Sequence, residues 1–470
     1  MIKFGTGGWR AIIADGFTKK NVQRLAQAVA IKMAQENQGG GKLAVGYDRR
    51  FLSHEAAIWA SEVLAGNGVN VLFIDKDAPT PLIMHVVKHR GLPYGMAVTA
   101  SHNPALYNGI KLFVAGGRDA DEEETNRLEG ILENLADADI KTMPFDTAVA
   151  AGRITIIRPQ NEYLDSILNM LDIDIIRKKN LKVALDPMFG VSKISLQTLL
   201  MTARCDVDTI HERRDALFGG RVPTPKIGTL NALTDFVKEN GCDIGIATDG
   251  DADRLGVIDN NGNFMHPNQI LTLLYYYLLK YKGWKGDCVR NIATTHLLDA
   301  VASDFGQKCH EVPVGFKHIS QMMAQTDSII GGESSGGLTV RGHIKGKDGI
   351  YAAMLLVEML AVSGRKLSDI QAEIECKYGH FVMVERDYHF TAADKEKIHH
   401  LLMHEQKLPD FPLEIERTSY LDGCKVYFKN GGWIIIRFSG TEPLVRVFCE
   451  MPTHDQAQHF CALMQQFLGL

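Results

Sequence analysis

The sequence predicts an α/β protein with three similar α/β domains, built on mixed or parallel sheets, and a C-terminal α+β domain, arranged around a central cleft. Three observations predict this fold class. The chain has 470 residues, whereas single hydrophobic cores stop growing at about 250–300 residues. Short apolar runs alternate with helical patterns in three successive segments, which is typical of parallel sheets covered by helices. Towards the end of the chain, closely spaced strand patterns replace this alternation.

The first unit is expected to span residues 1–150. Its strand candidates are short apolar runs, and its helix candidates repeat apolar residues at helical spacing. The expected strands are Lys42–Tyr47, Val69–Ile74 and Tyr94–Val98, and the expected helices include Asn21–Glu36 and Ser53–Gly66.

The same order of strands recurs in two further units, expected at 151–256 and 257–380. The repeat is weak in residue identity but consistent in order, so it predicts three domains of one plan. The expected strands are Lys182–Leu185, Cys205–Ile210 and Asp243–Ala247 in the second unit, and Cys288–Ala293, Cys309–Val314 and Ser328–Ile330 in the third, which a helix at Asn268–Tyr281 opens.

The last unit, 381–470, has a different pattern. Its expected elements are strands at Cys424–Phe428, Trp433–Ser439 and Leu444–Met451 and a covering helix at His454–Leu468. The residues Asn430-Gly431-Gly432 between the first two strands are typical of a hairpin turn. This unit is therefore predicted to be a small separate α+β domain.

Composition excludes several classes of function. Apolar residues make up 45% of the chain and charged residues 23%, as in ordinary globular proteins. The net charge is −5 and no basic stripe occurs, so nucleic acid is not expected as a partner. The longest apolar stretch, Ile350–Val362, is interrupted by Glu358 and too short to cross a bilayer, so no membrane partner is expected. No pattern specifies an oligomeric state.

The cysteines indicate a reducing compartment. The chain has eight, and none forms a CxxC pair, which argues against a zinc site. Many free thiols without a signal peptide favour the cytoplasm. Most of these residues lie in apolar runs, where small buried hydrophobic side chains are the expected role. They are Cys205, Cys242, Cys288, Cys309, Cys376, Cys424, Cys449 and Cys461.

In each unit, the third strand ends in an unusual loop. In the first unit the loop is Thr99-Ala100-Ser101-His102-Asn103-Pro104, which brings a seryl hydroxyl into a tight turn. In the third unit it is glycine-rich, Gly331-Gly332-Glu333-Ser334-Ser335-Gly336-Gly337. Because ligands of open α/β sheets bind beyond the carboxyl ends of strands, we expect the three loops to converge on one cleft.

The loop of the second unit carries three carboxylates on alternate residues, Asp249, Asp251 and Asp253. Alternation in an extended loop points them to one side, where their oxygens suit Mg²⁺. A calcium loop of the EF-hand type would need Gly and Glu where the chain has Arg254 and Asn260, so it is excluded. Together with Ser101, which would supply a further metal ligand through a phosphoserine oxygen, the cluster indicates phosphoryl transfer.

These motifs together resemble a known family. In chain order they are FGTGGWR at 4–10, TASHNP at 99–104, NGIK at 108–111, DGDADR at 249–254, GGESSGG at 331–337 and RFSGTEP at 437–443, followed by Arg446. The set resembles the α-D-phosphohexomutases, the family of phosphoglucomutases and phosphomannomutases, over nearly the whole chain. The resemblance implies a phosphorylated Ser101, Mg²⁺, and reversible phosphoryl transfer between O1 and O6 of a hexose phosphate through a 1,6-bisphosphate.

Four further residues are expected around the transferred phosphate. The substrate hydroxyl must lose a proton as it attacks, and either a lysine of depressed pKa or a histidine can accept it. Lys111 and His102 are both candidates, and the resemblance favours Lys111. Arg254, beside the carboxylates, is expected to steady phosphoryl oxygens. Arg10 follows two glycines, so its backbone can approach an anion.

Two groups of residues are expected to bind the substrate. Glu333 and Ser335 offer an acceptor and a donor to sugar hydroxyls, and nearby Lys317, His318 and Lys345 add basic contacts, whereas Lys347 is interpreted as a solvated charge. In the last unit, the non-reacting phosphate is expected to bind a nest of side chains and backbone N–H groups. Its members are Arg437, Ser439, Gly440, Thr441 and Arg446. Closure of this domain would exclude water.

Within the resemblance, the expected substrate is glucose 1-phosphate, interconverted with glucose 6-phosphate, and glucose 1,6-bisphosphate is the expected activator and intermediate. Loops of the form GGExSGH would favour mannose or glucosamine, and this loop ends instead in Gly337. Phosphomannomutase and phosphoglucosamine mutase remain alternatives. A metal-dependent phosphatase or an inactive sugar-phosphate binder is the alternative of a different class. The intact serine and carboxylates argue against an inactive binder, and the Arg437 nest argues against a phosphatase.

Overall fold

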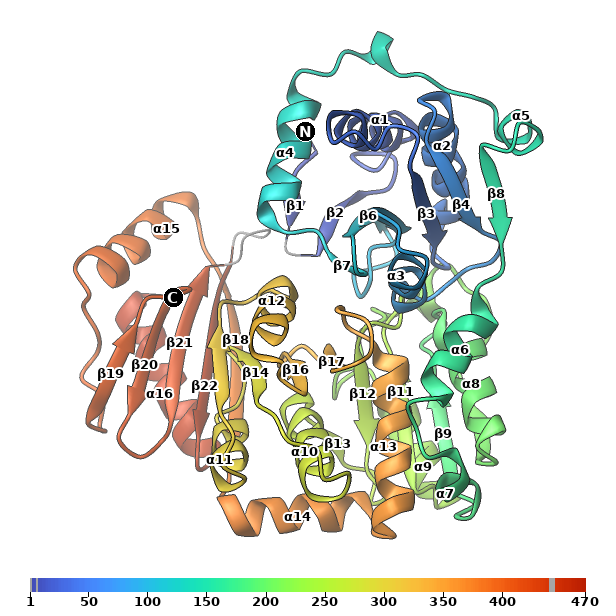
Figure 1. Ribbon diagram of the computed structural model, residues 1–470. Helices are drawn as coiled ribbons and strands as arrows, with labels where there is room; N and C mark the ends of the chain where they lie inside the picture. Colours follow the sequence, from blue (N-terminus) through green and yellow to red (C-terminus); the bar gives the residue numbers. More distant parts are fainter. Residues whose placement is uncertain (1, 6, 439–443) are drawn as a thin grey trace.

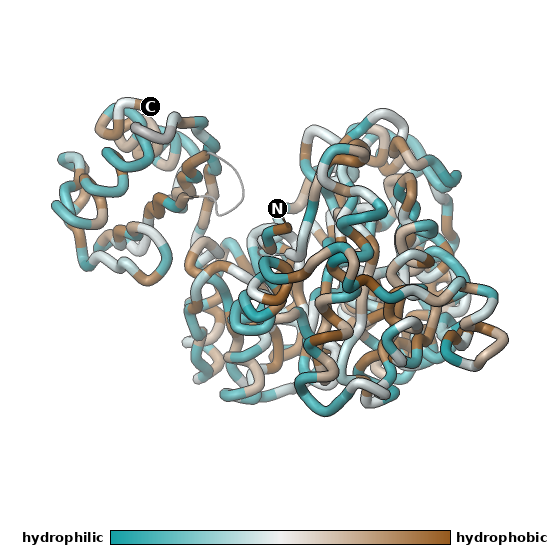
Figure 2. Tube along the Cα trace, turned by 90° about the horizontal axis from the view of Figure 1, so that it is seen from above, coloured by the Kyte–Doolittle hydropathy of each residue, from teal (hydrophilic) through white to brown (hydrophobic). Residues whose placement is uncertain are grey.

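The computed structural model describes residues 2–5, 7–438 and 444–470 and contains four sheets in four successive units (Figure 1). The three expected α/β domains and the C-terminal α+β domain are present, which confirms the fold class. Seen from above, the C-terminal unit lies to one side of the other three, and hydrophobic segments run through the interior of both parts (Figure 2).

The first unit has an eight-stranded mixed sheet in the order β1-β2-β6-β5-β3-β4-β8, with β7 paired to β6. Its strands are β1 (Phe4–Gly5), β2 (Gly8–Ile12), β3 (Lys42–Tyr47), β4 (Asn70–Ile74), β5 (Tyr94–Val98), β6 (Tyr107–Val114), β7 (Arg118–Asp119) and β8 (Ile154–Ile157). Its helices are α1 (Lys19–Gln35), α2 (Ser53–Gly66), α3 (Thr80–His89), α4 (Glu122–Glu133) and α5 (Phe145–Ala150).

The second unit has five strands in the order β10-β9-β11-β12-β13. They are β9 (Lys182–Asp186), β10 (Asp206–Thr209), β11 (Ile244–Thr248), β12 (Leu255–Ile258) and β13 (Phe264–Met265). The helices are α6 (Gln160–Leu168), α7 (Ile173–Arg177), α8 (Ser192–Thr202) and α9 (Asn231–Asn240), with a short 3₁₀ turn at Phe218–Gly220.

The third unit has four strands in the order β15-β14-β16-β17. They are β14 (Cys288–Asn291), β15 (Cys309–Val312), β16 (Ile330–Gly332) and β17 (Leu338–Val340). The helices are α10 (Pro267–Lys280), α11 (Leu297–Asp304), α12 (Phe316–Thr326), α13 (Gly349–Ser363) and α14 (Leu367–Tyr378). Apart from Glu358, helix α13 is apolar on all sides, and it is buried along nearly its whole length, as expected of a helix inside a large core.

The fourth unit has an antiparallel sheet in the order β18-β22-β21-β20-β19. Its elements are β18 (Val382–His389), α15 (Ala392–His399), a π-helical turn (His400–His404), β19 (Ile415–Ser419), β20 (Cys424–Phe428), β21 (Trp433–Phe438), β22 (Leu444–Met451) and α16 (His454–Leu468).

The internal repeat is visible in the strand order. In each of the first three sheets, three neighbouring parallel strands are followed by an antiparallel strand: β4-β3-β5-β6, β10-β9-β11-β12 and β15-β14-β16-β17. The antiparallel fourth strand returns directly from the carboxyl end of the third. The unusual loops are therefore the tips of three equivalent hairpins, β5–β6, β11–β12 and β16–β17.

The sheets do not end where the sequence patterns put the limits of the units. β8 lies beyond residue 150 but pairs in parallel with β4 of the first sheet. β12 runs through residue 256, and β13 extends the second sheet to Met265. In the third unit, β16 begins at Ile330 rather than Ser328. These differences arise because pairing with a distant strand, rather than local apolar character, decides which residues join a sheet.

The units are joined to different extents. One hydrophobic cluster runs continuously through the first three units, whereas the fourth has a core of its own. The fourth unit contacts the third through a small apolar cluster that includes Ile292, Tyr427 and Trp433. Beside this cluster, the fully buried Lys425 donates to the backbone oxygen of Ile292 at 2.6 Å and to Glu311 at 2.8 Å.

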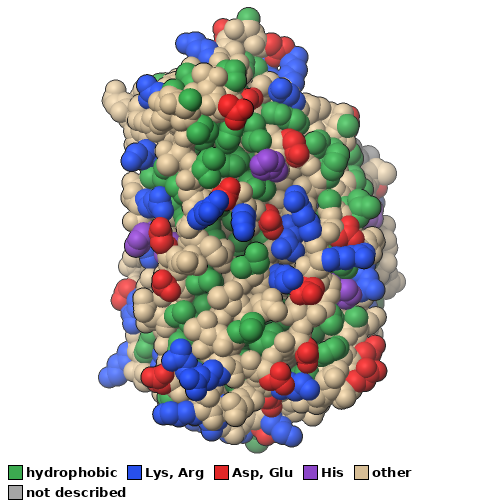
Figure 3. All heavy atoms as spheres, turned by 90° about the vertical axis from the view of Figure 1, so that its right-hand side faces the viewer, with side chains coloured by type: hydrophobic (Ala, Val, Ile, Leu, Met, Phe, Trp, Pro, Cys, Tyr) green, Lys and Arg blue, Asp and Glu red, His purple; other side chains and the backbone are tan. Residues whose placement is uncertain are grey.

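Within the described residues, no helix combines the length and apolar character needed to cross a membrane. On the face that Figure 3 shows, basic and acidic side chains are interspersed.

Candidate active site

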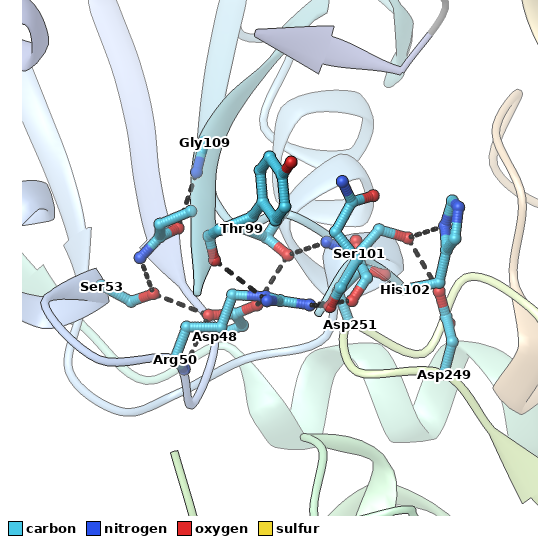
Figure 4. A network of polar contacts seen from close by, with 12 residues as sticks. Asp48, Arg50, Ser53, Thr99, Ser101, His102, Gly109, Asp249 and Asp251 are labelled. Carbon is cyan, nitrogen blue, oxygen red and sulfur yellow. Dashed lines mark hydrogen bonds and ion pairs between the residues drawn. The ribbon is translucent and has the colours of Figure 1, made fainter. Parts of the chain in front are cut away.

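Ser101 lies in the β5–β6 loop and is almost completely buried, with 1% of its surface exposed. Its hydroxyl donates a hydrogen bond to Asp249 Oδ2 of the second unit at 2.8 Å (Figure 4). Its φ is +52°, in the left-handed region that residues other than glycine rarely adopt. The fold thus holds one serine in a strained backbone conformation and against a carboxylate from another domain.

The three carboxylates of the β11–β12 loop form a compact cluster. Ligand oxygens of Asp249, Asp251 and Asp253 all lie within 4.8 Å of one another, and all three residues are buried. The Oδ1 atoms of Asp251 and Asp253 are buried and have no hydrogen-bond partner among the residues that the structure describes. Unsatisfied buried carboxylate oxygens are costly without a cation. An all-oxygen cluster with free acceptors therefore fits a divalent cation such as Mg²⁺.

Lys111, from β6, neutralises part of this cluster. Its Nζ donates to Asp251 Oδ2 at 2.7 Å and to Asp253 Oδ2 at 2.6 Å. Burial alone would lower the pKa of Lys111, but the two carboxylates raise it above its usual value. The expected lysine of depressed pKa is therefore not found here, because the ammonium group is paired with two anions.

The carboxylates differ in their acidity. Burial and the neighbouring Asp251 and Asp253 raise the pKa of Asp249 well above its usual value. Burial also acts on Asp253, but Lys111, Lys347 and Arg254 hold the pKa of that carboxyl well below its usual range. Negative charge is thus concentrated at the end of the cluster where the cations lie, and Asp249 is the member that a bound cation would have to deprotonate.

The other residues expected near the transferred phosphate lie around Ser101. His102 Nδ1 is 3.4 Å from Ser101 Oγ. Burial, Arg254 and Arg10 lower the pKa of His102 well below its usual value, so the imidazole is neutral at pH 7. Arg10 donates to Asn103 Oδ1 at 2.8 Å. Arg254 approaches through its backbone N–H, which donates to Asp249 Oδ1 at 3.1 Å.

The glycine-rich β16–β17 loop touches the carboxylate loop through its backbone, since the Leu255 N–H donates to the Gly336 oxygen at 3.1 Å. Glu333 Oε1 accepts from Asn291 Nδ2 at 3.2 Å and from the Gly315 N–H at 3.3 Å. The hydroxyl of Ser335 donates to Glu333 Oε2 at 3.3 Å. The loops of all three units therefore meet.

The basic residues expected beside the third loop lie in different surroundings. Lys317 pairs with Glu122 at the start of α4 and so links the third unit to the first. His318 is half-buried, and burial together with Lys317 lowers its pKa. Lys345 is exposed and has no ion-pair partner among the described residues. The electrostatic influence of Glu333 on His318 connects this group with the third loop.

Lys347, interpreted from the sequence as a solvated charge, belongs to the site. Its Nζ lies 3.1 Å from Asp253 Oδ2, and its side chain is 14% exposed. The interpretation was wrong because it used only the local run of polar residues at 341–348. That segment lies against the carboxylate loop: the neighbouring Gly349 N–H donates to the Ala252 oxygen at 3.1 Å. Thr80, whose hydroxyl donates to Asp251 Oδ2 at 2.6 Å, carried no sequence signal at all.

In the fourth unit, Arg437 and Arg446 lie directly opposite each other on β21 and β22. Arg437 Nε lies 3.1 Å from Asp422 Oδ2, and Asp422 in turn accepts from the Val314 N–H of the third unit at 2.8 Å. Arg446 pairs with Asp387 at 3.6 Å. Two opposed arginines are unfavourable unless an anion lies near them. The expected members Ser439, Gly440 and Thr441 lie outside the described residues.

Comparison with known proteins agrees with the fold and the motifs. Four models of phosphoglucomutase/phosphomannomutase domains match the chain in order: α/β/α domain I at residues 1–139, domain II at 161–262, domain III at 266–378 and the C-terminal domain at 393–466. The chain therefore belongs to the phosphoglucomutase/phosphomannomutase family, the α-D-phosphohexomutases.

Individual relatives cover almost the whole chain. A Thermococcus kodakarensis phosphoglucomutase/phosphomannomutase is 31% identical over 461 residues, which are 98% of this chain and 97% of the relative. A phosphoglucosamine/phosphogalactosamine mutase of Sulfurisphaera tokodaii is 29% identical over 476 residues, and the alignment covers 97% of this chain and 96% of the relative. The crystal structure of a Thermus thermophilus protein, assigned provisionally as a phosphomannomutase, superposes with a TM-score of 0.87 at 29% identity. The superposition covers 100% of this chain and 99% of that protein.

Proposed function

We propose that this phosphohexomutase interconverts glucose 1-phosphate and glucose 6-phosphate and uses Ser101 as its phosphate carrier. The observation that carries the proposal is the buried Ser101 hydroxyl, 2.8 Å from Asp249 within a three-carboxylate cluster. A serine is a weak nucleophile unless a base or a metal assists it, and this serine faces a cluster suited to a metal.

The reaction consists of two transfers of one phosphoryl group each. First, the free hydroxyl of the hexose monophosphate attacks the phosphorus on Ser101; a new O–P bond forms, the Ser101 Oγ–P bond breaks, and the sugar becomes a 1,6-bisphosphate. The bisphosphate then turns over, so that its other phosphate faces Ser101. Ser101 Oγ attacks that phosphorus, which regenerates the phosphoserine and releases the isomeric monophosphate. No phosphate is gained or lost over the cycle.

Asp249, Asp251 and Asp253, with an oxygen of phosphorylated Ser101, would hold Mg²⁺. The ion would supply positive charge that stabilises the oxygens of the transferring phosphoryl group. The paired Lys111 and Lys347 add cationic charge at the same end of the cluster. These groups act by electrostatic stabilisation, which is the main contribution that enzymes make to phosphoryl transfer.

His102 or Lys111 would move the proton of the attacking hydroxyl. His102 is neutral at pH 7 and its Nδ1 lies 3.4 Å from Ser101 Oγ, so it can accept the proton that the serine hydroxyl loses when Oγ attacks in the second transfer. Lys111 is charged in the protein without a cation, so in this state it can donate a proton but not accept one. For the step in which Ser101 attacks, the geometry therefore favours His102 as the base. A 10²–10⁴-fold fall of kcat in His102→Gln, on the order expected for loss of general acid–base catalysis, would support this role; unchanged kcat would assign it to Lys111.

The substrate would be held at both ends. Glu333 and Ser335 present oxygen atoms to sugar hydroxyls near the third loop. Arg437 and Arg446, opposed on neighbouring strands, suit the phosphate that is not being transferred. Their separate domain explains how both orientations of a bisphosphate can be accepted, because the distal phosphate always meets the same cations.

A second candidate substrate is glucosamine 1-phosphate. The name of the Sulfurisphaera tokodaii relative favours it, whereas that of the Thermococcus kodakarensis relative favours glucose or mannose. Gly337, where loops of the form GGExSGH have histidine, supports glucose. A phosphatase is less favoured, because hydrolysis has no need of a second phosphate site.

A coupled assay separates these substrates. Purified protein with Mg²⁺ and a catalytic amount of glucose 1,6-bisphosphate is given glucose 1-phosphate, mannose 1-phosphate or glucosamine 1-phosphate, and the 6-phosphate product is measured. The proposal predicts the highest kcat/KM with glucose 1-phosphate. A higher value with another sugar would reassign the substrate, and release of inorganic phosphate without a 6-phosphate would identify a phosphatase.

A further inference from the structure

A buried ion pair, Asp48 and Arg50, lies beside the backbone of Ser101, on the side away from His102 and Asp249 (Figure 4). Asp48 and Arg50 follow directly after β3 and are 1% and 2% exposed. Arg50 Nε lies 3.3 Å from Asp48 Oδ2. The sequence motifs did not include either residue. Burying a charged pair is costly unless its remaining donors and acceptors are satisfied, so the partners of this pair are informative.

Arg50 binds the carbonyl oxygens of the serine loop. Its Nη2 donates to the oxygens of Ser101 at 2.6 Å and Asn103 at 2.7 Å. Its Nη1 donates to the oxygens of Pro104 at 2.9 Å and Tyr107 at 3.0 Å. One guanidinium group therefore holds four carbonyl groups, three in the β5–β6 loop and one at the first residue of β6. Its planar, rigid set of donors is what makes such a fixed arrangement possible.

Asp48 holds the same serine from the other side. The Ser101 N–H donates to Thr99 Oγ1 at 2.8 Å, and the Thr99 hydroxyl donates to Asp48 Oδ2 at 2.7 Å. The polar contacts thus form a closed ring that runs from the Ser101 N–H through Thr99, Asp48 and Arg50 back to the Ser101 carbonyl group. Both polar backbone groups of Ser101 are fixed by one ion pair.

This ring explains how Ser101 keeps its unusual backbone. A serine at φ +52° is strained, and such a conformation persists only where the surroundings determine it. The second unit covers this ring of polar contacts, because the phenyl group of Phe218 packs on Arg50, with its centre 4.8 Å from Arg50 Cζ. In addition, a Cβ at Gly250 would lie 2.7 Å from the Ser101 oxygen. The carbonyl group of Ser101 is therefore confined between Arg50 and the carboxylate loop.

We propose that Asp48 and Arg50, acting through Thr99, are positioning residues that hold Ser101 Oγ in line for phosphoryl transfer. The inference rests on the proposed role of Ser101. Neither residue contacts the substrate in this assignment; the pair sets the position of the nucleophile. A displacement of a reacting atom by about 1 Å can cost on the order of 10²-fold in rate, so loss of the ring should lower kcat while substrate binding persists.

The test uses small changes within the ring and a control beside it. Thr99→Val removes the hydroxyl that links Ser101 to Asp48 but keeps the shape, and Thr99→Ser restores the hydroxyl. Arg50→Gln removes the guanidinium group. Arg49→Gln is the matched control: Arg49 is the neighbouring buried arginine, and it pairs with Asp77 at 2.6 Å rather than with the serine loop.

Two quantities are measured in each full-length variant: kcat and KM in the mutase assay, and the single-turnover rate at which glucose 1,6-bisphosphate phosphorylates Ser101. We expect kcat and the phosphorylation rate to fall about 100-fold in Thr99→Val and Arg50→Gln, with KM within about threefold of the wild-type value. Thr99→Ser should recover most of the loss, and Arg49→Gln should resemble the wild type.

Wild-type rates in folded Thr99→Val would overturn the inference, as would a loss confined to KM or an equal loss in Thr99→Ser. If Arg50→Gln does not fold, the comparison of Thr99→Val with Thr99→Ser decides the matter alone. Failure of the wild-type protein to become phosphorylated on Ser101 would instead contradict the proposed function. The two failures are therefore distinguishable.

Discussion

The side chain of Lys347 lies directly over Gly337, so closely that a Cβ at residue 337 would overlap Lys347 Cδ. From there, Lys347 Nζ reaches Asp253 Oδ2 at 3.1 Å. The absence of a side chain at Gly337 is therefore what lets a cation from just before α13 reach the carboxylate loop. Gly337, which the proposed function places on the sugar side of the site, therefore also affects the charge around the carboxylate cluster.

The first prediction concerns this pair. Gly337→Ala should push Lys347 away from Asp253 and lower kcat/KM by about tenfold, the effect of losing roughly 1.4 kcal/mol of charge stabilisation. Steady-state kinetics measure it. Gly130→Ala is the control, because a Cβ there meets nothing within 4 Å. Equal activity of Gly337→Ala and the wild type would show that Lys347 does not contribute to catalysis.

The second prediction concerns the carboxylate cluster. Asp251→Asn removes the negative charge of one proposed metal ligand, so Mg²⁺ binding should weaken at least about 10-fold. Titration with Mg²⁺ measures this change, with calorimetry and enzymatic activity as the two readouts. Asp235→Asn, on the exposed face of α9, should bind as the wild type does. Full turnover of the wild type in excess EDTA would contradict a role for the metal.

The third prediction concerns the distal phosphate. Arg437→Ala should raise KM for the sugar phosphate, because a charge-assisted contact is worth roughly 2–5 kcal/mol, or about 30- to several-thousand-fold in kcat/KM. Part of the loss can fall on kcat if the same contact closes the domain. Lys429→Ala, an exposed residue of the same domain, is the control. If Arg437→Ala kept wild-type KM and kcat, Arg437 would not bind the distal phosphate, and Lys317 or Lys345 would be the better candidate.

The fourth prediction is a pH dependence of stability at the junction of the third and fourth units. Burial and Arg290 lower the pKa of Lys425 to about 7, against 10.5 in the unfolded chain. Between these values the unfolded state binds more protons, so the free energy of unfolding rises with pH, by up to about 1.4 kcal/mol per pH unit. Below pH 7 both states are protonated, and the cost of burying the charge is fully present.

Lys425→Met removes this dependence, because a buried thioether does not titrate. The free energy of unfolding of the wild type minus that of Lys425→Met should therefore increase between about pH 7 and pH 9. Denaturant unfolding at several pH values measures it, with the exposed Lys429→Met as the control. A difference that stays constant over this range would show that Lys425 keeps an ordinary pKa.

Local sequence patterns predicted the parts of this fold whose signal is local. The boundaries of β3, β5, β20, β22, α2 and α16 agree with those expected from apolar runs and helical periodicity. The antiparallel strands β6, β12 and β17 were not expected, because their pairing depends on distant strands. β18, β19 and α15 of the last unit were missed as well, since their residues are largely exposed and polar.

The same distinction between local and tertiary signals applies to the residues of the candidate site. Ser101 and the three aspartates were found because they follow buried strands in recognisable motifs. Lys347, Thr80 and Arg50 were not, since each acts through tertiary contacts with residues far away in the chain. For Arg50 one signal was available: it follows β3 at the carboxyl end of a parallel strand, the same position that drew attention to Ser101.

The central claim is that Ser101 carries the phosphate, and the most direct measurement is mass spectrometry of the protein after incubation with glucose 1,6-bisphosphate and Mg²⁺. The account predicts one phosphate per chain, located on Ser101 by peptide fragmentation, and removed again by excess glucose 6-phosphate. Ser101→Ala should remain unphosphorylated and lose most of its activity. Phosphate confined to another residue, or full mutase turnover by Ser101→Ala, would contradict the account.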